Sequence, residues 1–214
     1  MFIKTIGSYT PLDPSSRRIP IRCPACLREG ILESIANSND IAPQSAKYCF
    51  GMRRCPNPTC AIHIFFIQDT SNFKTIFYPP ERLDFDATDI PEPIKKALIE
   101  AISCHSVECY AATALMVRRT LEELCKDRGA VGNNLKDRLA VLGSRVVLPK
   151  ELMDALDNVR LLGNDAAHVE SQDYAQIGKE EVEIAIEFTK EVLKAVYQYS
   201  GLLRRLTSLK RPTA

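Results

Sequence analysis

Hydrophobic and polar positions follow two different periods along the chain, and the change falls near residue 80. Before it, short apolar runs rich in strand-forming residues are separated by clusters of turn-forming residues. The runs at 61–67 and 73–78 are of this kind, and the polar segment 68–72 between them is typical of a turn. The pattern therefore predicts a β-hairpin inside a β-rich segment that extends from residue 19 to about 78.

After residue 93 apolar residues recur every three or four positions, which is the period of an amphipathic helix. Asn134 stands as an N-cap before one periodic segment, and Pro149 suits the first turn of another. The predicted helices are 94–128, as one helix or as two with a break near 103–106, then 135–142, 149–168, and 179 to beyond 206. Four or five helices of this length predict an antiparallel bundle.

These two patterns predict a fold of class α+β with two domains. Pro79 and Pro80 end the last strand, since proline cannot donate to a sheet ladder. The predicted divisions are a lead-in over 1–18, a small β-rich domain over 19–78, a linker over 79–93 and a helical domain over 94–210.

Four of the eight cysteines stand in two pairs beside predicted strands, separated by 28 residues. The pairs are Cys23 with Cys26 and Cys55 with Cys60. Two tight turns that each offer two thiolates match the tetrahedral site that zinc prefers, so we expect a structural zinc ribbon. Buried free cysteines are the competing interpretation, and Cys49 or His63 would replace a missing ligand. A four-thiolate site is closed to substrate and therefore structural.

The remaining cysteines predict no second metal site. Cys104, His105 and Cys109 fall in an amphipathic helical segment without a matching pair, and Cys125 lies on the apolar face of its predicted helix. We interpret all of them as ordinary residues of the helical domain.

Composition removes several classes of function. The 28 basic and 27 acidic residues leave a formal net charge of +1, so no global field attracts nucleic acid or anionic lipid. Tryptophan is absent and aromatic residues make up 7%, which weakens a base-stacking platform. Apolar runs are too short for a membrane span, and the start lacks a secretory signal. We expect a cytoplasmic protein without membrane contact.

Arg160, Asn164 and His168 recur every four residues of one predicted helix, where each step turns by roughly 40°. They form one slowly winding polar band suited to anionic groups. On the helix before it, Arg118 points toward the core and has Glu122 as its nearest partner. The five residues predict either a buried structural network or a site in which Glu122 orients Arg118 while His168 acts as acid or base.

The segments 116–124 and 159–168 resemble an all-helical bacterial family of unknown function. That family occurs alone, behind zinc ribbons and attached to restriction-endonuclease subunits. The resemblance covers roughly 94–205 and pairs an Arg-x-x-Leu-Glu helix with a Gly-Asn-x-x-Ala-His-like helix. Its motif positions are Arg118, Leu121, Glu122, Gly163, Asn164 and His168.

This family is in turn similar to the HEPN superfamily of helical domains, which often dimerise and include metal-independent ribonucleases. The resemblance implies that His168 activates or protonates ribose-phosphate groups and that an arginine stabilises the phosphorane charge. Gly163 stands where the superfamily carries an arginine before Asn164. Arg160 or Arg118 would have to supply that charge.

The resemblance predicts a zinc ribbon followed by an all-α HEPN-like bundle. It implies a homodimer that binds or cleaves RNA or another nucleic acid in bacterial or phage defence, without a catalytic metal. The ribbon would dock a protein partner or nucleic acid. The alternatives are a non-catalytic dimeric interaction module, whose Arg, Glu, Asn and His cluster is a structural network, and nucleotide binding without cleavage.

Overall fold

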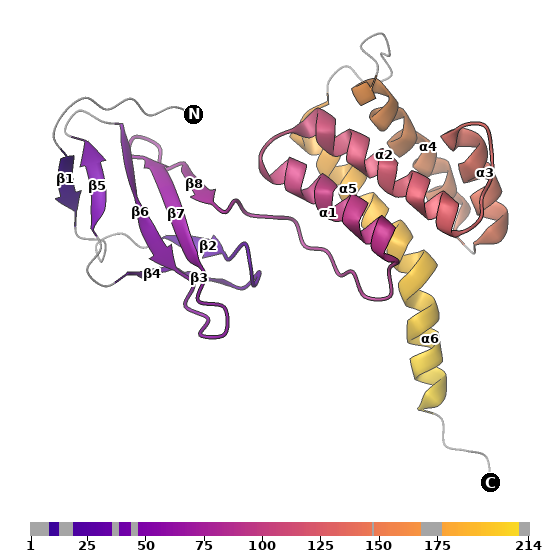
Figure 1. The fold of residues 1–214 in the computed structure, drawn as a ribbon, viewed down its shortest axis with the longest axis horizontal. Coiled ribbons are helices and arrows are strands. Elements are labelled where there is room, and N and C mark those ends of the chain that lie inside the picture. Colours follow the sequence, from indigo (N-terminus) through magenta and orange to yellow (C-terminus); the bar gives the residue numbers. More distant parts are fainter. Residues whose placement is uncertain are drawn as a thin grey trace. The chain divides into compact units, whose positions relative to one another are not determined.

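A computed structural model describes residues 9–12, 19–35, 39–43, 47–146, 148–167 and 177–209. The chain divides into two compact units, Met1–Arg82 and Leu83–Ala214. The first unit is β-rich and the second is helical (Figure 1), so the fold is mixed α+β as the periodicity predicts.

The β unit contains eight described strands. They are β1 (Tyr9–Leu12), β2 (Pro20–Arg22), β3 (Glu29–Ile31), β4 (Glu33–Ser34), β5 (Asp40–Pro43), β6 (Tyr48–Arg54), β7 (His63–Asp69) and β8 (Thr75–Tyr78). One antiparallel sheet has the order β1-β5-β6-β7-β8, with β4 paired to β6, and β2 pairs with β3 separately. The predicted hairpin is confirmed, since β7 and β8 pair antiparallel with Phe66 opposite Phe77. Strand β1 lies within the segment expected as a lead-in.

Small apolar clusters hold the β unit together. Ile64 and Phe66 of β7 are fully buried and lie in two different clusters. Arg53 and Asp40 form a buried ion pair with two contacts of 2.7 Å, and each side chain is only 1% exposed. Gly51 leaves the space that the Asp40 carboxylate occupies. The sequence pattern did not predict this internal charge pair.

The described residues of the helical unit form six α-helices and one π-helical turn. They are α1 (Glu92–Ser106), α2 (Tyr110–Asp127), α3 (Leu135–Arg145), α4 (Lys150–Ala167), α5 (Lys179–Leu193), the π turn η2 (Lys194–Gln198) and α6 (Tyr199–Ser208). The expected break in 94–128 is present, because α1 ends at Ser106. The predicted cap is also confirmed: the Asn134 side chain accepts a hydrogen bond from the Asp137 amide at 3.0 Å.

The last helix is interrupted where a regular helix was expected. The π turn η2 separates α5 from α6, and its Tyr197 donates to Asp127 of α2 at 2.6 Å. The guanidinium of Arg128 lies over the Tyr197 ring at 4.2 Å. These contacts to the end of α2 accompany the local change in helix register.

One apolar cluster forms the interior of the helical unit and includes residues from α1 to η2. Part of the segment expected as a linker belongs to this unit. Ile90 is buried in the cluster, and Leu83 and Phe85 pack against it. Gln198 also donates to the carbonyl oxygens of Asp86 and Thr88, at 2.9 and 3.2 Å. Among the described helices, none is long and apolar enough to cross a membrane.

Candidate metal centre and helical polar cluster

Two turns of the β unit present the four predicted cysteine ligands. The first turn joins β2 to β3 and the second joins β6 to β7. Each turn ends with a residue of positive φ directly after its second cysteine, Leu27 at 59° and Ala61 at 47°. The amides of both residues bond back to a carbonyl four positions earlier, that of Cys23 or Asn57. The two turns therefore share a backbone shape that directs paired thiols inward.

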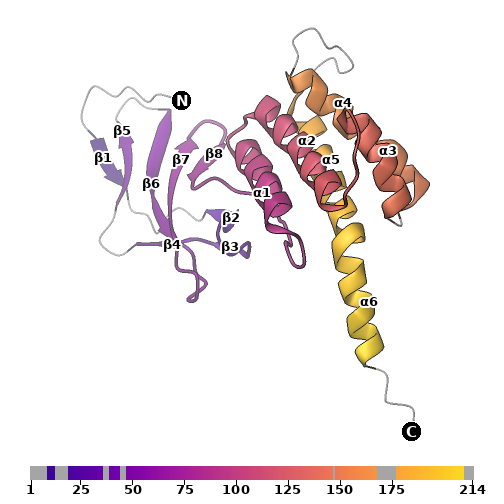
Figure 2. The ribbon, with the colours of Figure 1, turned by 45° about the vertical axis from the view of Figure 1, so that its right-hand side comes forward.

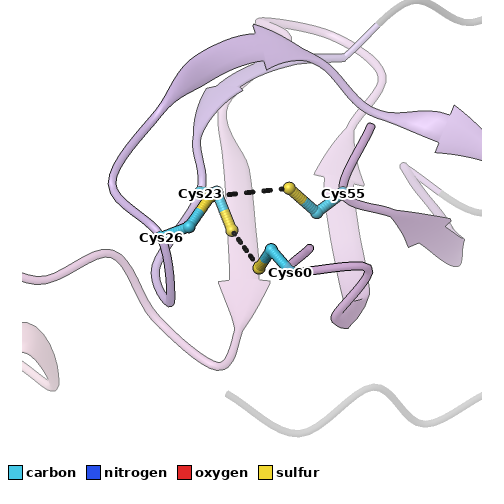
Figure 3. A group of neighbouring side chains, drawn as sticks. All are labelled: Cys23, Cys26, Cys55 and Cys60. Carbon is cyan, nitrogen blue, oxygen red and sulfur yellow. Dashed lines mark hydrogen bonds between the residues drawn. The ribbon is translucent and has the colours of Figure 1, made fainter. Parts of the chain in front are cut away.

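The four sulfur atoms come close enough to share one ion, since all lie within 4.8 Å of one another. Cys23 Sγ is 3.8 Å from Cys60 Sγ, and Cys26 Sγ is 3.7 Å from Cys55 Sγ (Figure 3). A tetrahedron with metal–sulfur bonds of about 2.3 Å has edges of about 3.8 Å. The observed separations thus match the edges of a tetrahedral thiolate site, and these cysteines could hold a metal ion.

The thiols differ in their tendency to ionise. A backbone hydrogen bond involving Arg28, together with the Asn57 side chain, lowers the pKa of Cys26 to about 6. Burial raises the pKa of Cys55 to about 12. A bound divalent cation would hold both as thiolates, because metal ligation requires the deprotonated form. The donor set is therefore chemically suited to a soft divalent cation.

The other candidate ligands lie elsewhere. Cys49 is buried beside Phe66, and His63 is exposed at the start of β7. Cys125 is part of the helical core, as expected. His105 Nε2 lies 3.0 Å from a Glu183 carboxylate oxygen. Within the described residues, no second group of three or more such side chains is close enough to hold an ion.

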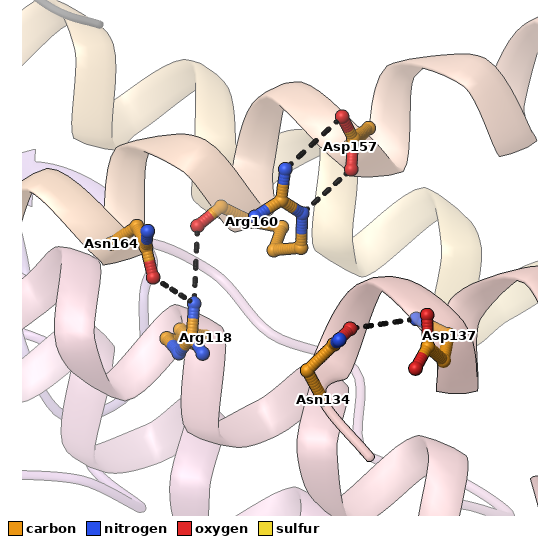
Figure 4. Close-up of polar contacts among 6 residues, drawn as sticks. All are labelled: Arg118, Asn134, Asp137, Asp157, Arg160 and Asn164. Atoms are coloured by element: carbon orange, nitrogen blue, oxygen red, sulfur yellow. Dashed lines mark hydrogen bonds and ion pairs between the residues drawn. The ribbon is translucent and has the colours of Figure 1, made fainter. Parts of the chain in front are cut away.

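Three of the predicted polar residues, Arg118 of α2 and Arg160 and Asn164 of α4, lie at the contact between these two helices (Figure 4). Arg118 donates from Nη1 to Oδ1 of Asn164 at 2.9 Å and to the carbonyl oxygen of Arg160 at 3.4 Å. Its Nε lies 3.4 Å from a Glu122 carboxylate oxygen. The Arg118 side chain therefore joins two helices through contacts to three of the predicted residues.

Arg160 turns its side chain away from this junction. Its Nε and Nη2 donate to the two carboxylate oxygens of Asp157, at 2.6 and 3.2 Å. These bonds lower the pKa of Asp157, so the carboxylate stays ionised at neutral pH. Arg160 thus contributes its backbone carbonyl to the junction, while its guanidinium is held by an acid one turn earlier on α4.

Gly163 explains why α2 and α4 approach closely at this point. A Cβ atom added there would lie 2.6 Å from the Cβ of Arg118 and 3.1 Å from the carbonyl oxygen of Ala114. Any larger residue at 163 would push the helices apart. The sequence alone showed Gly163 as a motif position of the resembled family and as a departure from the HEPN pattern, whereas the structure shows its packing role.

His168, the predicted acid or base, lies outside the described residues. The predicted cluster is therefore defined at four of its five positions: Arg118, Glu122, Arg160 and Asn164. Arg118 contacts each of the other three, and the Arg160 guanidinium binds Asp157.

Comparison with known families identifies a family that matches the second half of the chain. A family described as a domain of unknown function, DUF4145, matches residues 99–210, slightly more than half of the chain. No curated protein and no solved structure matches the chain. The matched region begins within α1, so the cysteine turns lie outside it. The link to a family of unknown function is confirmed, while the HEPN and restriction links stay predictions.

Proposed function

The chain belongs to the DUF4145 family, and on that premise we propose that it is a non-catalytic assembly module. In this proposal a zinc ion folds the β unit, and the helical unit binds protein partners, among them a second copy of the chain. The cysteines that such a zinc site requires must stay reduced, which favours a cytoplasmic protein.

Zinc is the ion that best fits the four cysteines. Four thiolates are soft ligands, and tetrahedral four-sulfur coordination is typical of zinc or iron–sulfur sites. Two separate turns that each supply two thiolates to one point are typical of a zinc ribbon. Four protein ligands leave no coordination position for water or substrate, so the ion would stabilise the fold.

The observation that carries the non-catalytic interpretation is the contact set of Arg118. Its guanidinium binds Asn164, Glu122 and the Arg160 carbonyl at the junction of two helices. A catalytic arginine must instead direct its donors at the position where charge develops on the substrate. The Arg118 contacts favour a structural role, in which the side chain holds α4 against α2.

The RNA-binding or RNA-cleaving hypothesis, with its role in defence, stays a prediction. It requires His168 to act with an arginine on a phosphate. The pairing of Arg160 with Asp157 and of Arg118 with Asn164 means that either guanidinium would have to leave its present partners. The same experiment tests this hypothesis and our proposal.

Purified wild type and His168→Ala should be incubated with a mixed RNA pool in magnesium-free buffer without chelator, so that zinc stays bound. We expect no cleavage by either protein and equal RNA retention on a filter. Arg118→Ala serves as the second variant, and we expect a lower thermal midpoint without any change in the RNA assays. Cleavage by the wild type that is lost in His168→Ala would overturn the non-catalytic proposal.

A further inference from the structure

The net charge of the chain is near zero, but acidic and basic residues are concentrated in different segments of its helical part. Residues 83–191 contain 21 acidic and 13 basic residues. Residues 192–214 contain five basic residues and no acidic one. The final helix therefore carries the opposite charge to the body from which it emerges.

Helix α6 also carries an apolar face that none of the other described helices covers. Figures 1 and 2 both show α6 extending beyond the ends of α1 to α5. Five large side chains on this helix and its C-cap are between 50% and 79% exposed: Tyr199, Leu202, Leu203, Leu206 and Leu209. Exposed apolar residues in such a row are typical of an interaction surface. We call these five residues the α6 stripe.

Four residues of the α6 stripe have the same spacing when counted from either end of the helix. Tyr199, Leu202, Leu206 and Leu209 are separated by three, four and three residues, which is the spacing of the apolar positions in coiled coils. A two-fold axis through the middle of this helix would place Leu202 opposite Leu206 of a second copy, and Tyr199 opposite its Leu209. An isologous dimer requires such a self-complementary surface.

We propose that α6 pairs antiparallel with α6 of a second copy, so that the two α6 stripes bury one another. This inference rests on the proposed function, because it assigns the surface through which the assembly module binds its own copy. It identifies the partner by its matching apolar spacing and by the charges beside the stripe.

The arginines of α6 are compatible with this pairing. At roughly 100° per residue, Arg204 lies on the face opposite the α6 stripe, and Arg205 lies on its flank. Arg205, Asp86 and Asp89 line the same hollow at the base of the helix. In an antiparallel pair equal flanks face each other, so Arg205 of each copy comes close to the acidic loop of the other. Hydrogen bonds from Thr88 lower the pKa of Asp86 and keep that carboxylate charged.

The small area of the α6 stripe limits the affinity that we expect for the dimer. A ten-residue helix with its cap offers less than the roughly 800 Å² per partner that a standard interface buries. We therefore expect a dimer that dissociates on dilution, and the mass should be measured across a wide range of protein concentration.

The test compares light-scattering masses of the wild type with those of two variants that add the same charge on opposite faces of α6. Leu206→Glu places a carboxylate in the centre of the stripe, and Ser208→Glu places one on the exposed polar face. We expect the wild type and Ser208→Glu to rise from 24.0 kDa to twice that mass with concentration. Leu206→Glu should raise the dissociation constant at least about tenfold, because an unpaired charge enters an apolar seam.

Leu202→Glu is a second stripe variant, and circular dichroism should show wild-type helix content in all variants. A wild-type mass of 24.0 kDa at every concentration, or a dimer unchanged by both stripe variants, would overturn the pairing. Wild-type sedimentation with phosphatidylserine vesicles that Leu206→Glu abolishes would also overturn it, and would assign the stripe to an anionic lipid surface. None of these results bears on RNA cleavage, so failure of the pairing is distinguishable from failure of the non-catalytic proposal.

Discussion

The β unit and the helical unit are stabilised by very different amounts of buried apolar surface. Among the described residues, 24 buried apolar residues form one cluster in the helical unit, whereas the β unit has two clusters of five and three. Two of the residues in the larger β cluster are Cys23 and Cys55. A small domain with so little core generally needs a metal or disulfides. The helical unit does not, because its core is continuous.

The polar clusters of the two units also differ, in whether their side chains surround a common point or contact one another. In the β unit, four thiols converge on a space of the size that one metal ion occupies. In the helical unit, the groups around Arg118 converge on one another across the α2–α4 contact. Polar groups that surround a common point can bind a ligand there, while groups that satisfy each other hold the fold together. This difference supports our proposal of a metal site in the β unit and a structural role for the helical cluster.

Removal of the proposed zinc ion should have the largest effect, and the effect should be confined to the β unit. Cys55→Ser, or treatment with a chelator, removes metal-binding energy on the order of 10 kcal/mol from the β unit. Hydrogen exchange should show loss of protection in β6 and β7, with the protection of α2 and α4 unchanged. Cys109→Ser is the matched control, because Cys109 is an exposed thiol of the helical unit. Equal protection of β6 in wild type and Cys55→Ser would contradict the assigned role of the metal.

Gly163→Ala should have the next largest effect. The added Cβ would meet the Arg118 Cβ at 2.6 Å, and we expect a loss of about 1–3 kcal/mol of unfolding free energy. Gly143→Ala on α3 is the control, since its Cβ would meet only the flexible end of Met153, at 3.1 Å. It should be neutral or stabilising by up to about 1 kcal/mol. Urea unfolding measures both, and equal stability of the two variants would contradict a tight α2–α4 contact.

The smallest expected effect is the coupling between Arg118 and Asn164. A double-mutant cycle with alanine at both positions should give about 0.5–1.5 kcal/mol, the range of a single hydrogen bond between partly buried groups. The control cycle uses Arg119 and Glu123, an ion pair at 2.7 Å on the same helix with an exposed arginine. That pair should couple by about 0.3–0.5 kcal/mol. A coupling free energy between Arg118 and Asn164 no larger than that of the control pair would contradict the structural interpretation of the Arg118 contacts.

Local patterns in the sequence predicted the features that depend on neighbouring residues. The strand-forming apolar runs at 61–67 and 73–78, with turn-forming residues at 68–72 between them, predicted the β7–β8 hairpin. Asn134 was predicted to cap α3, because the side chain of an N-cap residue accepts a hydrogen bond from an amide three residues later. The spacing of Cys23, Cys26, Cys55 and Cys60 singled out the thiols that the structure brings together.

Contacts between distant segments could not be read in this way. Asp40 and Arg53 occupy different strands, so nothing in either local sequence marks them as partners. Even on one helix, Arg160 was predicted only to share a polar band with Asn164 and His168, whereas the structure pairs its guanidinium with Asp157 one turn away. The π turn at 194–198 also had no local signal, and its Tyr197 contacts Asp127 of another helix.

The sequence by itself determined the α+β class, most of the helices and the four thiols, because periodicity and ligand spacing are properties of short segments. Tertiary structure alone decided which polar groups bind one another across different helices and strands. Gly163 lets α4 approach α2 until Arg118 reaches Asn164, and this distance depends on how two helices pack. Choice of partner for a charged side chain is a matter of a few ångströms across an interface, which no pattern along one segment encodes.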